Sequence, residues 1–279
     1  MQFGVTMFST DLAMRPDELA RAAEERGFAS LYVPEHTHIP TSQRTPPPTG
    51  DTELPDYYKR AFDPLVGLAM AAAATERLRV GTGICLVAQR DPIVTAKAVA
   101  SLDHLSGGRF VFGIGFGWNA DEIADHGVEM SRRREVAREH VLAMQRLWAD
   151  DVASFDGAFV HLPPSWSWPK PVQKPWPPIL VGGAAGPTLF AHIAEYANGW
   201  IPIGGAGVRE ALAALHGAME DAGRDPADVR VVPFGTIPDP GKLEYYESIG
   251  IDEVVLRIPL GDAGVVLPAL DDYAKVVDA

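Results

Sequence analysis

Short apolar runs alternate with longer amphipathic stretches along almost the whole chain, and this alternation limits the fold more than any other feature. Eight runs have the length and apolar character of strands: 2–8, 30–34, 79–84, 109–115, 178–182, 199–203, 230–235 and 253–258. Seven stretches between them are expected to be helices: 16–26, 64–74, 92–105, 131–148, 188–196, 209–222 and 242–248. Strict alternation of strand and helix predicts parallel strands joined by right-handed crossovers.

Eight such units close more naturally into a barrel than into an open sheet. A doubly wound open sheet stays an alternative, although the Gly-rich turn typical of that fold is missing after the first predicted strand. We therefore expect one α/β domain over residues 1–279, a single (β/α)8 TIM barrel. Two long segments, 36–60 and 150–177, interrupt the rhythm as insertions after the second strand and before the fifth strand.

The composition narrows the class of partner. The 37 acidic and 24 basic residues give a net charge of −13, which disfavours binding to phosphate backbones, so we expect no nucleic acid partner. No apolar run approaches the roughly 18 residues of a membrane span. The first strand begins at Gln2, which leaves no room for a signal peptide, and the lone Cys85 cannot form an internal disulfide. We expect a cytoplasmic protein with a small-molecule substrate and no membrane partner.

A carboxylate and a histidine stand where the second predicted strand ends, on the face at which barrels build active sites. His36 can donate or accept a proton near neutral pH, and we expect Glu35 to orient it. A hydrogen-bonded turn without a ligand stays an alternative, as does a metal site formed by Glu35, His36 and His38. The other strand ends offer no matching His or Asp, so we predict no metal.

Glycines are concentrated in the third and fourth predicted strands. Residues 80–84 read Val-Gly-Thr-Gly-Ile, and residues 112–119 read Phe-Gly-Ile-Gly-Phe-Gly-Trp-Asn. Glycine weakens a strand unless a bulge or a ligand needs the space. We therefore predict that Gly115, Gly117, Trp118 and Asn119 lie beside a ligand at the ends of the strands, although glycines also mark ordinary tight turns.

A loop of small residues follows the fifth predicted strand and leads into a helix. This loop consists of Gly182, Gly183, Ala184, Ala185 and Gly186. Small residues let backbone N–H groups approach an anion, and the start of the following helix adds partial positive charge. The sequence therefore predicts a phosphate site made without Lys or Arg, with a plain strand-to-helix turn as the alternative. Motifs of serine hydrolases, zinc proteases and P-loop NTPases are absent from the sequence.

Several of these motifs together resemble one family. Residues 169–183, which read PKPVQKPWPPILVGG, are similar to the segment before strand 5 of luciferase-like monooxygenases and their deazaflavin-dependent relatives. The run 81–84, the pattern 113–118 followed by Asn119 and Glu122, and the residues 198–200 match in the same order. The resemblance covers nearly the whole chain and is vaguest after Gly235.

The resemblance implies a cofactor site at the C-terminal face of the barrel. Family members bind FMN or the deazaflavin F420 there, and a non-proline cis peptide, by position Gly83–Ile84, supports the ring. The cofactor phosphate would lie on the loop 182–186, Trp118 and Asn119 would lie near the cofactor, and His36 would lie near the reactive ring carbon. Homodimers are usual in the family.

The resemblance also favours F420 over FMN. The pair Glu35-His36 is similar to the deazaflavin-dependent subgroup, and the arginine-rich composition agrees with an actinobacterial source. We expect hydride transfer between C5 of the deazaflavin and a small organic substrate, whose pocket is walled by Trp118 and by Trp166 or Trp168. For the last two residues, packing in the core or in a lid stays an alternative. The alternatives are an FMN-dependent monooxygenase that uses O2 with a partner flavin reductase, and a flavin-binding protein without catalysis.

Overall fold

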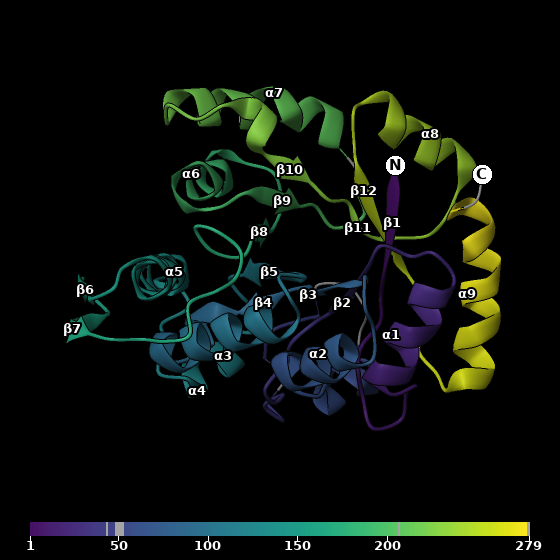
Figure 1. Cartoon of the computed structure of the whole chain (residues 1–279), viewed down its shortest axis with the longest axis horizontal. Coiled ribbons are helices and arrows are strands. Elements are labelled where there is room, and N and C mark those ends of the chain that lie inside the picture. The colour runs from purple at the N-terminus through teal and green to yellow at the C-terminus, as the bar shows by residue number, and fades with distance from the viewer. Residues whose placement is uncertain (43, 48–52, 206, 278–279) are drawn as a thin grey trace.

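The computed structural model describes residues 1–42, 44–47, 53–205 and 207–277. Parallel strands form one large sheet in the order β10-β9-β8-β5-β3-β2-β1-β12-β11, with β4 paired to β5 (Figure 1). The strands of this sheet are β1 (Gln2–Thr6), β2 (Ser30–Val33), β3 (Arg79–Thr82), β4 (Cys85–Leu86), β5 (Phe110–Gly115), β8 (Ile179–Gly182), β9 (Gly199–Ile201), β10 (Arg230–Val231), β11 (Phe234–Thr236) and β12 (Glu253–Arg257).

Helices lie around the outside of the sheet (Figure 1). They are α1 (Pro16–Glu25), α2 (Pro64–Ala73), α3 (Pro92–Leu105), α4 (Ala120–Asp125), α5 (Arg133–Ala149), α6 (Pro187–Tyr196), α7 (Val208–Asp221), α8 (Pro240–Ser248) and α9 (Ala263–Val277). The short helices η1 (Asp56–Arg60), η2 (Val87–Gln89) and η3 (Pro226–Asp228) lie in the connections. None of these helices in the described part of the chain is long and apolar enough to cross a membrane.

The sheet is curled, and segment 230–236 contains both of its end strands, β10 and β11. The backbone N–H of Phe234 donates to the carbonyl of Pro202 beyond β9 at 2.9 Å, and that of Val255 in β12 donates to the carbonyl of Pro233 at 2.9 Å. Every strand pairing within the sheet is parallel. The structure thus confirms an α/β fold on a curled parallel sheet.

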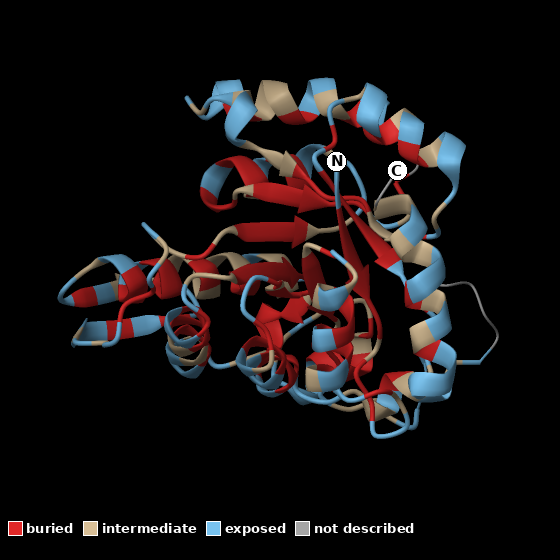
Figure 2. Ribbon diagram, turned by 45° about the vertical axis from the view of Figure 1, so that its right-hand side comes forward, coloured by how far each residue is buried: buried red, intermediate tan, exposed pale blue. Residues whose placement is uncertain are grey.

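Alternate residues of the strands face two different apolar cores. One core consists of residues from six neighbouring positions around the sheet: Tyr32, Val111, Leu180, Ile201, Val232 and Val255. The residues before and after these, such as Leu31 and Val33 in β2, belong to the larger core against the helices. This alternation follows from the two-residue repeat of a strand, and it makes the strands buried on both faces, as Figure 2 shows.

A buried ionic cluster lies where several strands begin. The carboxylate of Glu253, 1 % exposed, accepts hydrogen bonds from the Ser30 hydroxyl at 2.6 Å and from Arg230 at 2.6 Å. Arg79 lies 2.9 Å from the same carboxylate. Because this ionic cluster occupies the end of the sheet where the strands begin, a ligand site is expected at the opposite end, where the strands finish.

The structure differs from the sequence prediction where the backbone is interrupted. The predicted third strand breaks after Thr82 at a cis peptide between Gly83 and Ile84, and β4 follows. The predicted seventh strand splits into β10 and β11 around Pro233, which has no N–H to donate to a ladder. Helices α4 and α9 were not predicted, because α4 is short and the C-terminal segment carries no distinctive motif.

The two long segments also differ in character. Segment 36–60 connects β2 to α2 through η1, although residues 43 and 48–52 lie outside the described residues. Segment 150–177 contains an antiparallel hairpin of β6 (Ala153–Asp156) and β7 (His161–Ser165). In Figure 1 this hairpin projects from the side of the molecule near α5, away from the curled sheet.

Candidate active site

His36 is held by a buried carboxylate from the neighbouring strand-to-helix connection. Its Nδ1 lies 2.8 Å from Oε2 of Glu122, and the two side chains are 6 % and 1 % exposed. The other oxygen of Glu122 accepts from the backbone N–H of Thr37 at 3.3 Å. Because Nδ1 is used in this contact, Nε2 is the ring nitrogen left for proton exchange with a ligand.

The prediction that Glu35 orients His36 is wrong. Glu35 accepts a hydrogen bond from the backbone N–H of Leu86 at 2.7 Å and from Arg90 Nε at 2.6 Å. Consecutive residues of an extended chain point to opposite sides, so Glu35 turns toward η2 while His36 turns toward α4. Arg90 also binds Asp63, the N-cap of α2, at 2.6 Å. Glu35 therefore fixes the turn that carries His36 without touching the imidazole.

Aromatic rings surround His36 and form a wall. The ring centroid of His36 lies 5.2 Å from that of Tyr58 and 5.8 Å from that of Trp118. Tyr58 lies 4.9 Å from Phe8, which follows β1, and stacks on Tyr57 at 5.0 Å. Trp118 thus lies beside His36, and its contact with a cofactor or a substrate stays a prediction. The wall is built from the ends of three strands and from η1, which segment 36–60 brings over the site.

Trp166 and Trp168 do not join this wall. They are 81 % and 58 % exposed, and the carbonyl of Trp168 accepts a hydrogen bond from Lys97 in the middle of α3. The prediction that one of them walls the substrate pocket is therefore wrong. The stretch that carries both tryptophans lies against the outside of α3, whereas the hairpin of the same segment brings Phe159 to a pocket lined by Gln89 and Val136.

The cis peptide implied by the resemblance is present, and it sets the apolar floor of the site. The side chain of Ile84 points between β5 and β8, because a Cβ at Gly115 would lie 2.4 Å from its Cδ1 and a Cβ at Gly182 would lie 3.0 Å from its Cγ2. Ile84 and Phe234, both partly buried, cover the inner core. Gly115 and Gly182 thus make room for Ile84, whereas the sequence suggested that they make room for a ligand.

Gly117 and Asn119 also have structural roles, in the turn before α4 and at its N-cap. Gly117 has a φ of 74°, a conformation that other residues rarely adopt, and its carbonyl accepts from Arg133. The side chain of Asn119 is the N-cap of α4 and accepts from the N–H groups of Asp121 and Glu122 at 3.1 and 3.3 Å. The cap anchors the start of α4 and with it Glu122, the residue that contacts His36.

The small-residue loop 182–186 lies between β8 and α6 with its backbone accessible. Ala184 and Ala185 are exposed, and a Cβ at Gly186 would have no atom within 4 Å. Among the described residues, no side chain caps the first turn of α6. The indole N–H of Trp200 donates to the carbonyl of Gly183 at 2.8 Å and so fixes the loop on β9. Free N–H groups at the start of a ten-residue helix suit a phosphate group.

Further polar residues lie next to His36, but they do not form a metal site. His38 Nε2 lies 3.0 Å from Asp125, and the hydroxyl of Thr37 lies 2.8 Å from His126 Nε2. No group of three or more His, Cys, Asp or Glu side chains in the described ranges has an arrangement that could hold a metal ion. Glu35, His36 and His38 point to three different partners.

Glu122 is the functional candidate that sequence reasoning missed. It belongs to the pattern that carries the family resemblance, but nothing in the spacing of residues 36 and 122 links the two. The only local signal is its position one turn into a helix that follows a Gly-rich strand end.

Comparison with known proteins gives the class of the protein. The family model of luciferase-like monooxygenases matches residues 13–237. A protein of Mycobacterium tuberculosis described only as uncharacterized is 45 % identical over 262 residues, which are 93 % of this chain and 92 % of the relative. A phthiodiolone/phenolphthiodiolone dimycocerosates ketoreductase of Mycobacterium kansasii is 31 % identical over 286 residues, 95 % of this chain and 77 % of the relative. The chain belongs to the luciferase-like monooxygenase family.

Solved structures share the fold at low sequence identity. An F420-dependent secondary alcohol dehydrogenase in complex with an F420-acetone adduct aligns with a TM-score of 0.78 at 18 % identity, over 100 % of this chain and 99 % of the other. The monooxygenase RslO1 from Streptomyces bottropensis aligns with a TM-score of 0.78 at 21 % identity, over 99 % and 98 %. These likenesses show that the chain shares the fold of both structures, and the family match places it in the luciferase-like monooxygenase family.

Proposed function

We propose that the protein is an F420-dependent oxidoreductase that transfers hydride between the deazaflavin and a small organic substrate, such as a ketone or a secondary alcohol. The observation that carries this proposal is the buried contact between His36 and Glu122 at the end of β2, within a wall of aromatic rings. Bound F420 supplies or accepts a hydride at C5 of its ring. The protein must then hold the ring, exclude water and handle one proton.

His36 is the residue that handles the proton. When a ketone is reduced, hydride reaches the carbonyl carbon and His36 Nε2 gives its proton to the carbonyl oxygen, so that an alcohol forms. In the opposite direction Nε2 takes the proton of the hydroxyl group while hydride leaves the same carbon. Glu122 stabilises the protonated imidazole and holds Nδ1, whereas Glu35 only positions the turn.

The residues at the strand ends fit a flat ring with a phosphate tail. Ile84 and Phe234 offer an apolar floor, Trp118 and Tyr58 offer walls, and the loop 182–186 offers backbone N–H groups at a helix start. We propose Gly83, Ile84, Gly117 and Trp118 as neighbours of the ring. Gly115 and Gly182 contribute indirectly, because they make room for Ile84. Asn119 contributes as the N-cap of α4, and Gly182 also begins the phosphate loop.

An FMN-dependent monooxygenase is the second candidate, and the structural likeness to a monooxygenase favours it. That reaction would consume O2 and would depend on a partner flavin reductase. A flavin-binding protein without catalysis is the third candidate, for which His36 would have no effect on turnover.

Four broader features are part of the same proposal. We propose that residues 1–279 form a single domain and that the curled sheet closes as a (β/α)8 barrel through segment 230–236. We also propose that the protein is cytoplasmic and forms a homodimer. The dimer is supported by exposed apolar side chains on the adjacent helices α2 and α3, namely Val66, Met70, Ile93, Val94 and Leu105.

Cofactor binding tests the proposal most directly. The purified protein would be titrated with F420 and with FMN, and quenching of cofactor fluorescence would give both dissociation constants. Tight F420 binding with weak FMN binding is the expected result, followed by O2-independent turnover of ketones or secondary alcohols. Preference for FMN would replace the proposal with the monooxygenase, and binding of neither cofactor would refute the site.

A further inference from the structure

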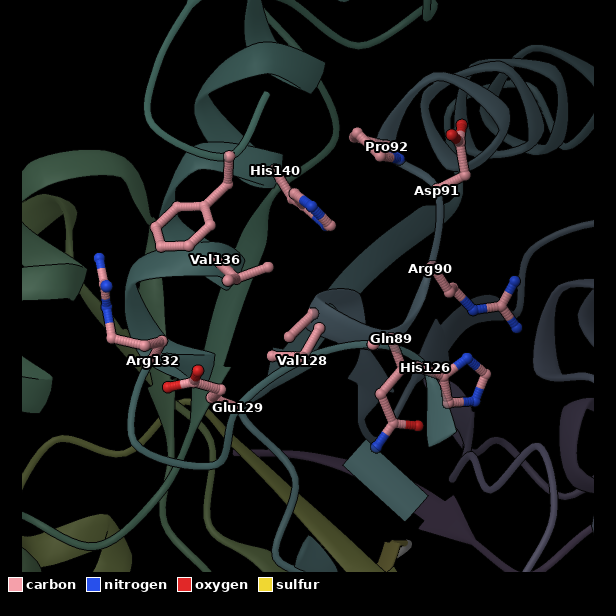
Figure 3. A pocket seen from close by; sticks show the side chains of 13 residues that line it. Gln89, Arg90, Asp91, Pro92, His126, Val128, Glu129, Arg132, Val136 and His140 are labelled. Atoms are coloured by element: carbon pink, nitrogen blue, oxygen red, sulfur yellow. The ribbon is translucent and has the colours of Figure 1, made fainter. Parts of the chain in front are cut away.

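A cavity of about 480 Å³ lies beside the His36–Glu122 pair, between the start of α3 and the connection from α4 to α5 (Figure 3). One wall residue, Arg90, binds Glu35, and another, His126, lies 2.8 Å from the hydroxyl of Thr37. The cavity therefore adjoins the turn that carries His36. Its volume falls within the roughly 300–1,000 Å³ that small-molecule sites usually have.

Gln89, which lines this cavity, is a buried carboxamide without a partner. It is 7 % exposed, and neither its Oε1 nor its Nε2 has a hydrogen bond to any described residue. A Cβ at Gly117 would lie 3.4 Å from Nε2, so the amide reaches the residue before Trp118. In Figure 3 the Gln89 side chain runs between Val128 and His126. Because an unpaired buried amide is costly, this pair of atoms indicates a ligand group that supplies both a donor and an acceptor.

His140 adds a hydrogen-bond acceptor to the same cavity. Its Nδ1 lies 2.8 Å from the carbonyl oxygen of Val87, and since a carbonyl only accepts, Nδ1 carries the proton. Burial lowers the pKa of His140 below its ordinary value, which keeps the ring neutral near pH 7. Nε2 of a neutral ring protonated on Nδ1 is an acceptor.

The cations of the cavity are already paired, which argues against an anionic ligand. Arg90 binds Glu35 and Asp63, and Arg132 binds Glu135 at 2.7 Å while its guanidinium lies 4.9 Å from the ring of Phe159. The rest of the lining combines the apolar side chains of Val128, Val136 and Phe159 with the carboxylates of Asp91 and Glu129. The two carboxylates disfavour an anion further, and the amide, the neutral imidazole and the apolar side chains together fit an uncharged ring with polar substituents.

We propose that this cavity binds the non-reacting part of the substrate, and that this part is a small neutral ring carrying a carboxamide or hydroxyl group. A carboxamide on the ring pairs with Gln89, and a hydroxyl group donates to Nε2 of His140. The cavity then holds the body of the substrate while its carbonyl or alcohol group lies at His36. Only the identification of the ligand as a substrate rests on the proposed function; the binding pocket itself does not.

The test uses 4-hydroxybenzamide, a neutral ring that carries both groups, in calorimetric titrations of the full-length protein. We expect binding to the wild type and a loss of at least about tenfold in affinity for Gln89→Leu, because two hydrogen bonds are removed. The charged analogue 4-hydroxybenzoate should bind the wild type more weakly. Val128→Trp, which fills the cavity, should abolish binding of the amide.

Gln145→Leu is the matched control. Gln145 is equally buried at 7 % exposure but is not part of the cavity, and its amide donates to the carbonyl of Tyr196. This variant should keep the affinity for 4-hydroxybenzamide. A melting curve of each variant shows that it is folded.

Three results would overturn the inference: equal affinity of the wild type and Gln89→Leu, preference for 4-hydroxybenzoate, or no binding of the amide to the wild type. The F420 affinity of each folded variant is measured in parallel. Tight F420 binding together with one of these results refutes the pocket alone. Lack of F420 binding, with the amide still dependent on Gln89, refutes the cofactor proposal alone.

Discussion

At the scale of single residues, the site depends on the direction in which each side chain points from the backbone. Glu35 and His36 are consecutive, yet the first binds Arg90 and the second binds Glu122. A buried imidazole needs a fixed partner for one nitrogen if the other is to exchange protons in a defined direction. Glu122 supplies this partner from an element 86 residues away.

The first prediction concerns His36. We expect His36→Ala to lower kcat with F420 and a ketone or alcohol by about 100-fold or more, the usual contribution of a general acid or base. The F420 dissociation constant should stay within about twofold, since the imidazole handles the proton and does not hold the cofactor. Steady-state kinetics and fluorescence titration measure the two quantities.

His38→Ala is the matched control for this prediction. His38 is a histidine two residues further on, with 41 % of its side chain exposed and bound to Asp125. Its removal should leave kcat nearly unchanged. If both variants lost activity equally, or if neither did, His36 would not be the proton-handling residue.

At the scale of elements, the close approach of β3 requires a glycine at position 113 of β5. A Cβ at Gly113 would lie 2.0 Å from the carbonyl oxygen of Thr82, which is backbone and cannot turn away. The Thr82 hydroxyl also donates to the carbonyl of Gly113 at 2.6 Å. This close approach holds β3 in place just before the cis peptide and the floor residue Ile84.

A second prediction follows for this contact. Gly113→Ala should lower the free energy of unfolding by about 1–3 kcal/mol or more, because the strands must separate. Gly186→Ala should change it little, since no atom lies within 4 Å of the new methyl group. Urea unfolding curves of the two variants measure the difference. Equal stabilities would show that β3 and β5 are not in this close contact.

The contact between α5 and η2 makes stability depend on pH. Burial lowers the pKa of His140, so the folded state holds this ring neutral at pH values where the unfolded chain is already protonated. The unfolded state then binds more protons, and stability rises with pH in that window. The stability is fully present above the unfolded pKa, about 6.5, and is lost as the pH falls toward the lowered folded value.

The third prediction tests this linkage. The free energy of unfolding of the wild type should fall between pH 7.5 and pH 5.5, and His140→Asn should show a shallower fall. His192, whose pKa is lowered by burial and by Arg134, contributes in the same direction and stays in both proteins. Unfolding curves at several pH values measure the slopes, and identical slopes would contradict the assignment to His140.

At the scale of the whole molecule, one face has an exposed apolar surface. Val66 is 63 % exposed and Met70 is 38 % exposed on α2, and Val94 is 67 % exposed on α3, a helix that packs against α2. The fourth prediction is that light scattering after gel filtration finds a dimer for the wild type and a monomer for Val66→Glu/Met70→Glu. Val265→Glu, at an exposed apolar position on α9, should stay dimeric. A wild-type monomer would refute the proposed dimer.

Several parts of the molecule could be predicted from the sequence because their signals are local. Strand and helix periodicity gave the order of elements, since each depends on neighbours a few residues apart. The helix starts at Pro16, Pro64 and Pro92 follow from the fixed φ of proline. His36 and Trp118 were predicted to lie at one edge because strand ends in such a fold meet there, and their ring centroids are 5.8 Å apart.

Only the tertiary structure decided the contacts between distant segments. The sequence determined an alternating α/β fold, a histidine at a strand end and a small-residue loop before a helix. It could not determine that Glu122 instead of Glu35 binds His36, that Gly115 and Gly182 make room for Ile84, or that Trp166 and Trp168 lie outside. Local propensity acts over one turn or one strand, whereas these outcomes depend on which side chains packing brings together across dozens of residues.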